Sequence, residues 1–157
     1  MQNAEGYINS RKSYATSGSD YNSWKALSAV ADDVIARQKD KEFGYFVFAP
    51  DALAYQPRYA MIYNFKKNNT KAFEYTKKST TYIIAAPPPA DNPYMTYVWW
   101  SKIQVKISSE PVSTQRLPNG FTIERFNLSL EEQKIPHVKE IELGIHFLLN
   151  STAKLAA

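Results

Sequence analysis

The stretch Gly44–Asn69, GYFVFAPDALAYQPRYAMIYNFKKNN, decides the fold of this chain. It begins with the apolar run Tyr45–Ala49, and a short run without polar alternation is typical of a strand that is covered on both faces. Pro50-Asp51 ends the run. An amphipathic segment then begins at Pro57, a residue that the first turn of a helix accepts because the N–H groups of that turn are unpaired. The order strand, turn, helix is half of a βαβ unit.

Elements of the same kind flank this stretch on both sides. Upstream, a helix is expected to begin around Ser19-Asp20, since either side chain can cap the first free N–H groups, and residues 24–35 place apolar side chains on one helical face. Downstream, Lys71–Lys78 predicts a short helical turn, and Thr81–Ala86 predicts a second buried strand. We expect the two buried strands to run side by side in the same direction, with helical crossovers between them.

The last third of the chain changes to a β pattern. Residues 112–117 and 121–128 flank Pro118-Asn119-Gly120, in which proline presets φ and Asn-Gly tolerates positive φ, so a β-hairpin is expected. Glu140–Phe147 alternates strictly and predicts an edge or antiparallel strand. Tyr94–Ile107 is interpreted as a helix that gives way near its end.

These elements predict an α/β fold: a three-layer sandwich with a short, mainly parallel sheet (strands near 45–49 and 81–86) and a C-terminal β-hairpin plus edge strand. The length of 157 residues favours one domain, over residues 21–150, after a polar leading segment at 1–20 and before a tail at 151–157.

Both ends of the chain suggest a boundary made by cloning. The last four residues, Lys154–Ala157, resemble the translated cloning sites of an expression vector. Met1 would then be the start of a cloned segment, and we expect the natural protein to extend on the N-terminal side. Within the sequence given, no apolar stretch approaches the roughly 20 residues that a membrane span needs.

Composition argues against several classes of function. The net charge of +4 is spread along the chain without a stripe of arginines, so a nucleic-acid partner is not expected. The absence of cysteine excludes disulfides, thiolate metal sites and a cysteine nucleophile. His137 and His146 have no partners at metal-ligand spacing, so no metal site is expected. No phosphate-binding glycine motif or nucleophile elbow occurs, and no cofactor is expected.

Two acids follow the two buried strands and suggest a candidate ligand site. Asp51 and Asp91 end strands that we expect to be neighbours, and in open α/β sheets ligands lie beyond the carboxyl ends of the strands. Tyr55, Gln56 and Arg58 would line the wall of such a crevice, which suits a sugar, a phosphate or a polar head group. The competing interpretation, that the two aspartates only cap turns and helices, is favoured.

The aromatic pair Trp99-Trp100 also has two interpretations. It suits a sugar-stacking platform or a membrane-interface belt, but such a pair more often divides, with one ring in the core and one at the surface. The divided arrangement is expected here.

Residues 24–128 resemble the soluble domain that follows the membrane helices in polytopic, lipid-linked-sugar glycosyltransferases, the group that includes aminoarabinose transferase and the protein mannosyltransferases. The resemblance rests on the order of five segments: SWKALSAVADDVIARQ, GYFVFAP, PRYAMIYNF, TTYIIAAPPP and PNGFTIERFNL.

The resemblance implies a location and a partner. The domain would face the extracytoplasmic side of a cell-envelope membrane and pack over the membrane-embedded portion of the same polypeptide, with a sugar or lipid phosphate as possible ligand. In that family the catalytic acids lie in loops between membrane helices, so no catalytic residue is expected in this chain. Lys66, Lys67, Lys77 and Lys78 would then lie toward anionic lipid head groups, although plain solubility is the favoured interpretation of these lysines.

Three hypotheses of function follow. The leading one is an accessory extracytoplasmic domain of a membrane glycosyltransferase-like protein, without activity when isolated. The alternative is an extracytoplasmic small-ligand-binding or sensory domain that uses the crevice of Asp51 and Asp91. A free-standing soluble enzyme ranks third, because no nucleophile, base and orienting group can be assembled from the sequence.

Overall fold

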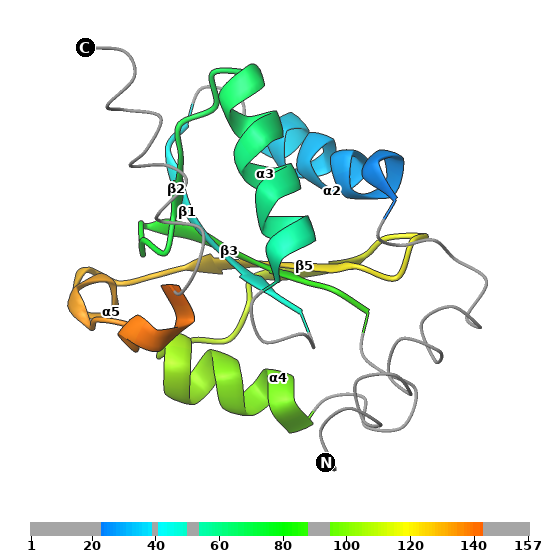
Figure 1. Cartoon of the computed structure of the whole chain (residues 1–157). Coiled ribbons are helices and arrows are strands. Elements are labelled where there is room, and N and C mark those ends of the chain that lie inside the picture. The colour runs from blue at the N-terminus through cyan, green and yellow to red at the C-terminus, as the bar shows by residue number, and fades with distance from the viewer. Residues whose placement is uncertain (1–22, 39–40, 50–53, 88–94, 143–157) are drawn as a thin grey trace.

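A computed structural model describes residues 23–38, 41–49, 54–87 and 95–142 of the chain (Figure 1). The helices and strands follow one another as α2 (Trp24–Arg37), β1 (Phe43–Phe48), α3 (Tyr55–Lys67), β2 (Ala72–Glu74), β3 (Thr80–Ala85), α4 (Met95–Trp99), the π-helix η1 (Trp100–Val105), β4 (Ser113–Arg116), β5 (Thr122–Asn127), α5 (Leu130–Lys134) and the 3-10 helix η2 (Lys139–Glu142).

The described strands form one five-stranded sheet in the order β2-β1-β3-β5-β4. β1 is parallel to both β2 and β3, with Tyr45 opposite Tyr82. β5 is antiparallel to both β3 and β4. The predicted parallel pairing of the two buried strands is therefore confirmed, as is the α/β class, while the sheet as a whole is mixed and not mainly parallel.

Helices cover both faces of the sheet, which gives the three predicted layers. Figure 1 shows α2 and α3 above the sheet and α4 and α5 below it. Successive residues of β1 alternate between the two layers: Tyr45 and Val47 belong to the core under α2 and α3, and Phe46 belongs to the core on the other side. Because both faces are buried, the strand carries no polar residue, as its sequence indicated.

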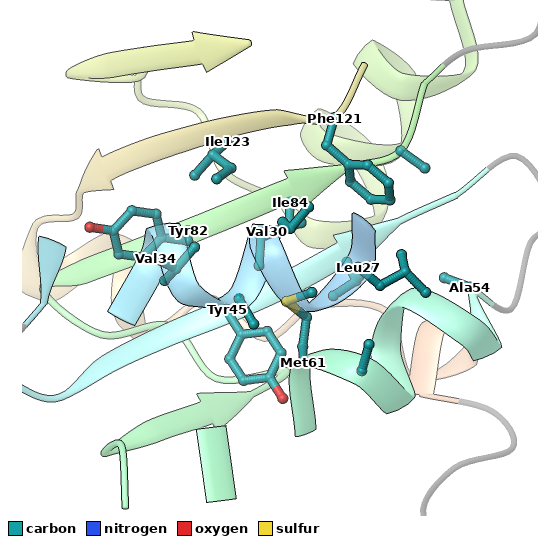
Figure 2. Close-up of a cluster of buried hydrophobic side chains, with 14 of the residues drawn as sticks. Leu27, Val30, Val34, Tyr45, Ala54, Met61, Tyr82, Ile84, Phe121 and Ile123 are labelled. Carbon is teal, nitrogen blue, oxygen red and sulfur yellow. The ribbon is translucent and has the colours of Figure 1, made fainter. Parts of the chain in front are cut away.

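The core beneath α2 and α3 is built from side chains of both helices and of three strands (Figure 2). Val30 and Val34 of α2 and Met61 of α3 are fully buried. They meet Ile84 of β3 and Ile123 of β5. The amphipathic spacing of α2 is thus explained by its contact with the sheet, as predicted.

Local signals account for several element ends. Ser23 caps α2, since its hydroxyl accepts a hydrogen bond from the N–H of Ala26 at 3.2 Å, whereas the predicted cap Ser19-Asp20 lies outside the described residues. α3 ends at Lys67 with Asn68 as its C-cap, and Asn69 follows with φ +50°, as expected of Asn at a helix end. In the hairpin, Gly120 has φ +87°, the conformation that Asn-Gly predicted.

Three segments differ from the prediction or add to it. Lys71–Lys78 was expected to form a helical turn, but it contains the edge strand β2, because its backbone pairs with β1. Lys139–Glu142 is a 3-10 helix and not the start of a strand, and the rest of the predicted strand, from Leu143, lies outside the described residues. The unpredicted α5 begins at Ser129, whose hydroxyl accepts from the N–H of Glu132 at 3.1 Å. A serine followed three residues later by glutamate is the signal that would have predicted α5.

The helix expected over Tyr94–Ile107 is confirmed in its described part, including its irregular end. α4 passes into the π-helix η1, which ends at Lys106 with φ +60°. The hydroxyl of Tyr97 donates a hydrogen bond to the carboxylate of Glu124 on β5, which anchors this helix to the sheet. In the described part of the chain, no helix combines the length and the apolar character needed to cross a bilayer.

Candidate interaction surface on helices α2 and α3

The structure describes three of the five residues of the predicted crevice. Asp51 and Asp91 lie outside the described residues. Tyr55 and Gln56 are exposed at the start of α3. Arg58, one residue after Pro57, is only 1% exposed, so it does not lie on the wall of an open crevice. This corrects the expectation for Arg58.

Arg58 instead holds α3 against the edge strand β2. Its Nε lies 2.9 Å from the Oε1 of Glu74, and the two side chains are 2% and 11% exposed. The guanidinium also lies over the ring of Tyr75, 4.5 Å from the ring centroid. A buried arginine requires such partners, because the transfer of an unpaired charge out of water is costly.

The same cluster extends to the C-terminal part of the described chain. His137 stacks on Tyr75 with ring centroids 5.9 Å apart, and its Nε2 contacts the carboxylate of Glu142. Burial, followed by the charge of Glu74, raises the pKa of Tyr75 and that of Tyr45 well above the ordinary tyrosine value. These ion-pair and ring contacts connect the side chains to one another. The cluster is therefore a structural junction of α3, β2 and the 137–142 segment.

The four lysines that the resemblance would turn toward a membrane differ in their exposure. Lys66 and Lys67 are exposed in the last turn of α3. Lys78 is half-buried, forms an ion pair with Glu42 at 3.3 Å and lies over the ring of Phe73. Lys77 is buried, which corrects both interpretations of this residue, the membrane-facing one and the solvated one. A lipid-facing role is thus geometrically open to Lys66 and Lys67.

An exposed aromatic cluster lies beside these two lysines. Trp24 of α2 and Tyr59 and Tyr63 of α3 are 48%, 56% and 44% exposed. Their rings touch, with centroids 5.2 Å apart for Trp24 and Tyr63 and 6.1 Å apart for Trp24 and Tyr59. Tyr55, one turn earlier, is also exposed. We call the group Trp24, Tyr55, Tyr59, Tyr63, Lys66 and Lys67 the α3 face.

The helical period of α3 explains why these side chains point outward. Ala60, Met61 and Phe65 are buried in the core, and Asn64 donates a hydrogen bond from its Nδ2 to the Oγ of Ser28 on α2 at 3.3 Å. Residues spaced by three or four from Tyr59 therefore share the opposite side.

The charged side chains of the α3 face are all positive. Helix α3, YQPRYAMIYNFKK, contains no aspartate or glutamate, and it ends in Lys66 and Lys67. Because Arg58 is buried, the outward charge of this helix comes from the two lysines. The α3 face therefore combines amphipathic rings with positive charge.

The opposite layer carries a second exposed apolar patch, of different composition. Val98 and Trp99 of α4 and Ile103 of η1 are each more than half exposed. Trp100 is half-buried against Phe48, with ring centroids 5.2 Å apart, so the tryptophan pair divides as predicted. Within the described ranges, no group of three or more His, Asp or Glu side chains could hold a metal ion.

The chain matches no protein-family model, no curated protein and no solved structure. The resemblance to the glycosyltransferase domains therefore rests on the order and composition of the elements alone.

Proposed function

We propose that this chain is an accessory extracytoplasmic domain of a membrane glycosyltransferase-like protein, and that it turns its α3 face toward the anionic surface of the membrane. The observation that carries the proposal is the outward group of three tyrosines and two lysines on α3, a helix without acidic residues, which Trp24 of α2 joins through its ring contacts with Tyr59 and Tyr63. The membrane-embedded portion of the same polypeptide would be its partner.

The chemistry of these side chains suits the interfacial region of a bilayer. Tyrosine and tryptophan have an apolar body and a polar tip, and both are enriched at the level of the head groups. A lysine near an anionic bilayer contributes about 1 kcal/mol of attraction. Lys66 and Lys67 lie one turn beyond Tyr63, so ring insertion and charge attraction would act on the same side of the domain.

The proposal gives the domain a binding role and leaves the chemistry to other parts of a longer protein. The element order that resembles the glycosyltransferase domains supports it. An upstream coding sequence for several membrane helices in the encoding gene is expected, and a gene that begins at Met1 and encodes no such helices would contradict it.

Vesicle binding tests the surface itself. The full chain is sedimented with phosphatidylcholine vesicles that contain or lack phosphatidylglycerol, and binding is expected only with the anionic lipid. The double change Lys66→Glu and Lys67→Glu should lower the apparent affinity about tenfold or more, since about 1 kcal/mol per lysine is lost. Trp24→Ala and Tyr59→Ala should also weaken binding.

Matched changes on the opposite layer provide the control. Lys134→Glu with Lys139→Glu makes the same change of charge below the sheet, where both lysines are exposed, and Trp99→Ala removes a ring that is 54% exposed. These controls should bind as the unmodified chain does. A loss of binding in the controls that equals or exceeds the loss in the α3 variants would refute the proposal.

A further inference from the structure

A polar cavity of about 210 Å³ lies at the end of α2, away from the α3 face. Its wall is formed by the end of α2, by β3 and by the hairpin strands, through Arg37, Gln38, Tyr82, Ser113, Gln115 and Arg125. The hairpin runs alongside α2, since Asn119 in its turn donates a hydrogen bond to the carbonyl of Ala26 at 3.1 Å. The cavity therefore opens where the last turn of α2 meets the far end of the hairpin.

Three buried polar atoms on this wall make no hydrogen bond within the protein: the Oε1 of Gln38, the Oε1 of Gln115 and the Nε of Arg125. Among the described residues, no other buried side-chain nitrogen or oxygen atom lacks a hydrogen-bond partner. Such atoms are rare in native proteins, because they have lost water without gaining another partner. All three belong to side chains that line this one cavity, so two acceptors and one donor there have no partner within the protein.

Neighbouring side chains determine which functional groups remain available. The Nε2 of Gln38 donates to the hydroxyl oxygen of Tyr82 at 2.7 Å, and the Nε2 of Gln115 donates to Asp33 at 3.4 Å. Both amides thus use their NH₂ group inside the protein, and their carbonyl oxygens are left as acceptors. Gln38 is itself only 6% exposed.

The charge on the wall is positive. Arg37 is held by Asp33 through contacts of 2.8 Å and 3.3 Å, so these two charges largely offset each other. The charge of Arg125 then gives the cavity a net positive potential, with its Nε available as a donor. A ligand must therefore present one anionic or strongly accepting group to Arg125 and donor groups to Gln38 and Gln115.

We infer that this cavity binds a small organic anion whose carbon frame carries hydroxyl or ammonium groups. A carboxylate would accept from the Nε of Arg125, and the hydroxyl or ammonium groups would donate to the two glutamine oxygens. The cavity volume corresponds to about seven waters at roughly 30 Å³ each, which suits a molecule of the size of an amino acid or a monosaccharide acid. The inference is independent of the α3 face, since the two groups of residues do not overlap.

Calorimetry and NMR titration of the full chain with chosen probes test the inference. Glucuronate and tartrate represent hydroxylated anions, and glutamate represents an aminated one. Propionate has the charge without the donors, and glucose has the donors without the charge. Saturable binding is expected for at least one member of the first group, with shifted amide signals around Gln38 and Gln115 and much weaker binding of propionate and glucose.

Variants on one hairpin separate the cavity from the general surface. Arg125→Gln and Gln38→Leu should each weaken the binding about tenfold or more. Arg116→Gln removes an exposed arginine of the same hairpin outside the cavity wall and should leave the binding of the probe unchanged. Near-UV circular dichroism verifies that each variant is folded. Failure of every probe to bind would mean that the cavity holds water only, and equal effects of Arg125→Gln and Arg116→Gln would show that the anion binds elsewhere; either result would overturn the inference.

Discussion

The ammonium group of Lys77 lies 2.6 Å from the carbonyl oxygen of Lys106 and 3.0 Å from that of Ile135. These contacts tie the loop between β2 and β3 to the end of η1 and to the end of α5. Burial lowers the pKa of Lys77 to about 8, against a partly compensating attraction from Glu132. A lysine that was expected on the surface is thus a cross-link below the sheet.

This burial gives the stability a characteristic pH dependence. The pKa of Lys77 is lower in the folded chain than the ordinary value of 10.5, so between pH 8 and 10.5 the unfolded chain binds more protons and the free energy of unfolding rises with pH. Urea titrations should show wild type gaining stability relative to Lys77→Met across this window, by up to about 3 kcal/mol. Parallel curves for the two proteins would contradict the assigned pKa.

Replacing only one partner of the ion pair between Arg58 and Glu74 should lower the free energy of unfolding strongly. Arg58→Met leaves the largely buried carboxylate of Glu74 without the arginine charge, and a loss of about 3 kcal/mol in unfolding free energy is expected. The double variant Arg58→Met with Glu74→Leu should recover part of this loss, because no charge then stays behind. A double-mutant cycle by chemical denaturation measures the coupling, and additive effects would show that the pair does not interact.

Gly44 should not tolerate a side chain. A Cβ atom at this position would lie 1.7 Å from the carbonyl oxygen of Thr76, a backbone atom that cannot move without disturbing the connection from β2 to β3. Gly44→Ala should lower the unfolding free energy by about 3 kcal/mol or more, as expected of severe overpacking. Thermal denaturation compares the melting temperature of Gly44→Ala with that of a control variant, Thr114→Ala, at an exposed position of β4. Similar melting temperatures of the two variants would be incompatible with this packing.

Glu132 should contribute to the acid sensitivity of the fold. Burial by itself would raise its pKa, but hydrogen bonds from the N–H of Ser109 at 3.0 Å, from the N–H of Ser108 at 2.6 Å and from the Ser109 hydroxyl lower the pKa below the ordinary 4.5. Because the folded pKa is the lower one, its stabilisation is complete above pH 4.5 and disappears as the pH falls through the folded value.

The variant Glu132→Gln tests this contribution. It should cost about 1 to 2 kcal/mol near neutral pH, because a charge-assisted acceptor is lost, and should show a shallower loss of stability in acid. Fluorescence-detected acid unfolding compares the two proteins, with Glu131→Gln, the exposed neighbour, as control. An acid transition that is identical in wild type and Glu132→Gln would exclude this role.

Only part of the α3 face could be predicted from the sequence. The helical spacing of Tyr59, Tyr63 and Lys66 placed them on one side of α3. The contribution of Trp24 was not predicted, because it comes from α2 and depends on how the two helices pack. The predicted grouping of Lys77 with Lys78 was wrong for Lys77, since adjacent residues in an irregular segment need not share an environment.

The sequence by itself determined the two buried strands and the hairpin around Asn119-Gly120, because each depends on patterns within a few consecutive residues. Tertiary structure alone decided that residues 72–74 form an edge strand, that Arg58 pairs with Glu74, and that Gln38, Gln115 and Arg125 meet at one cavity. The acceptors of Lys77 lie 29 and 58 residues further along the chain. No local pattern specifies such a contact, because it forms only when the packing of the whole sheet removes both partners from water.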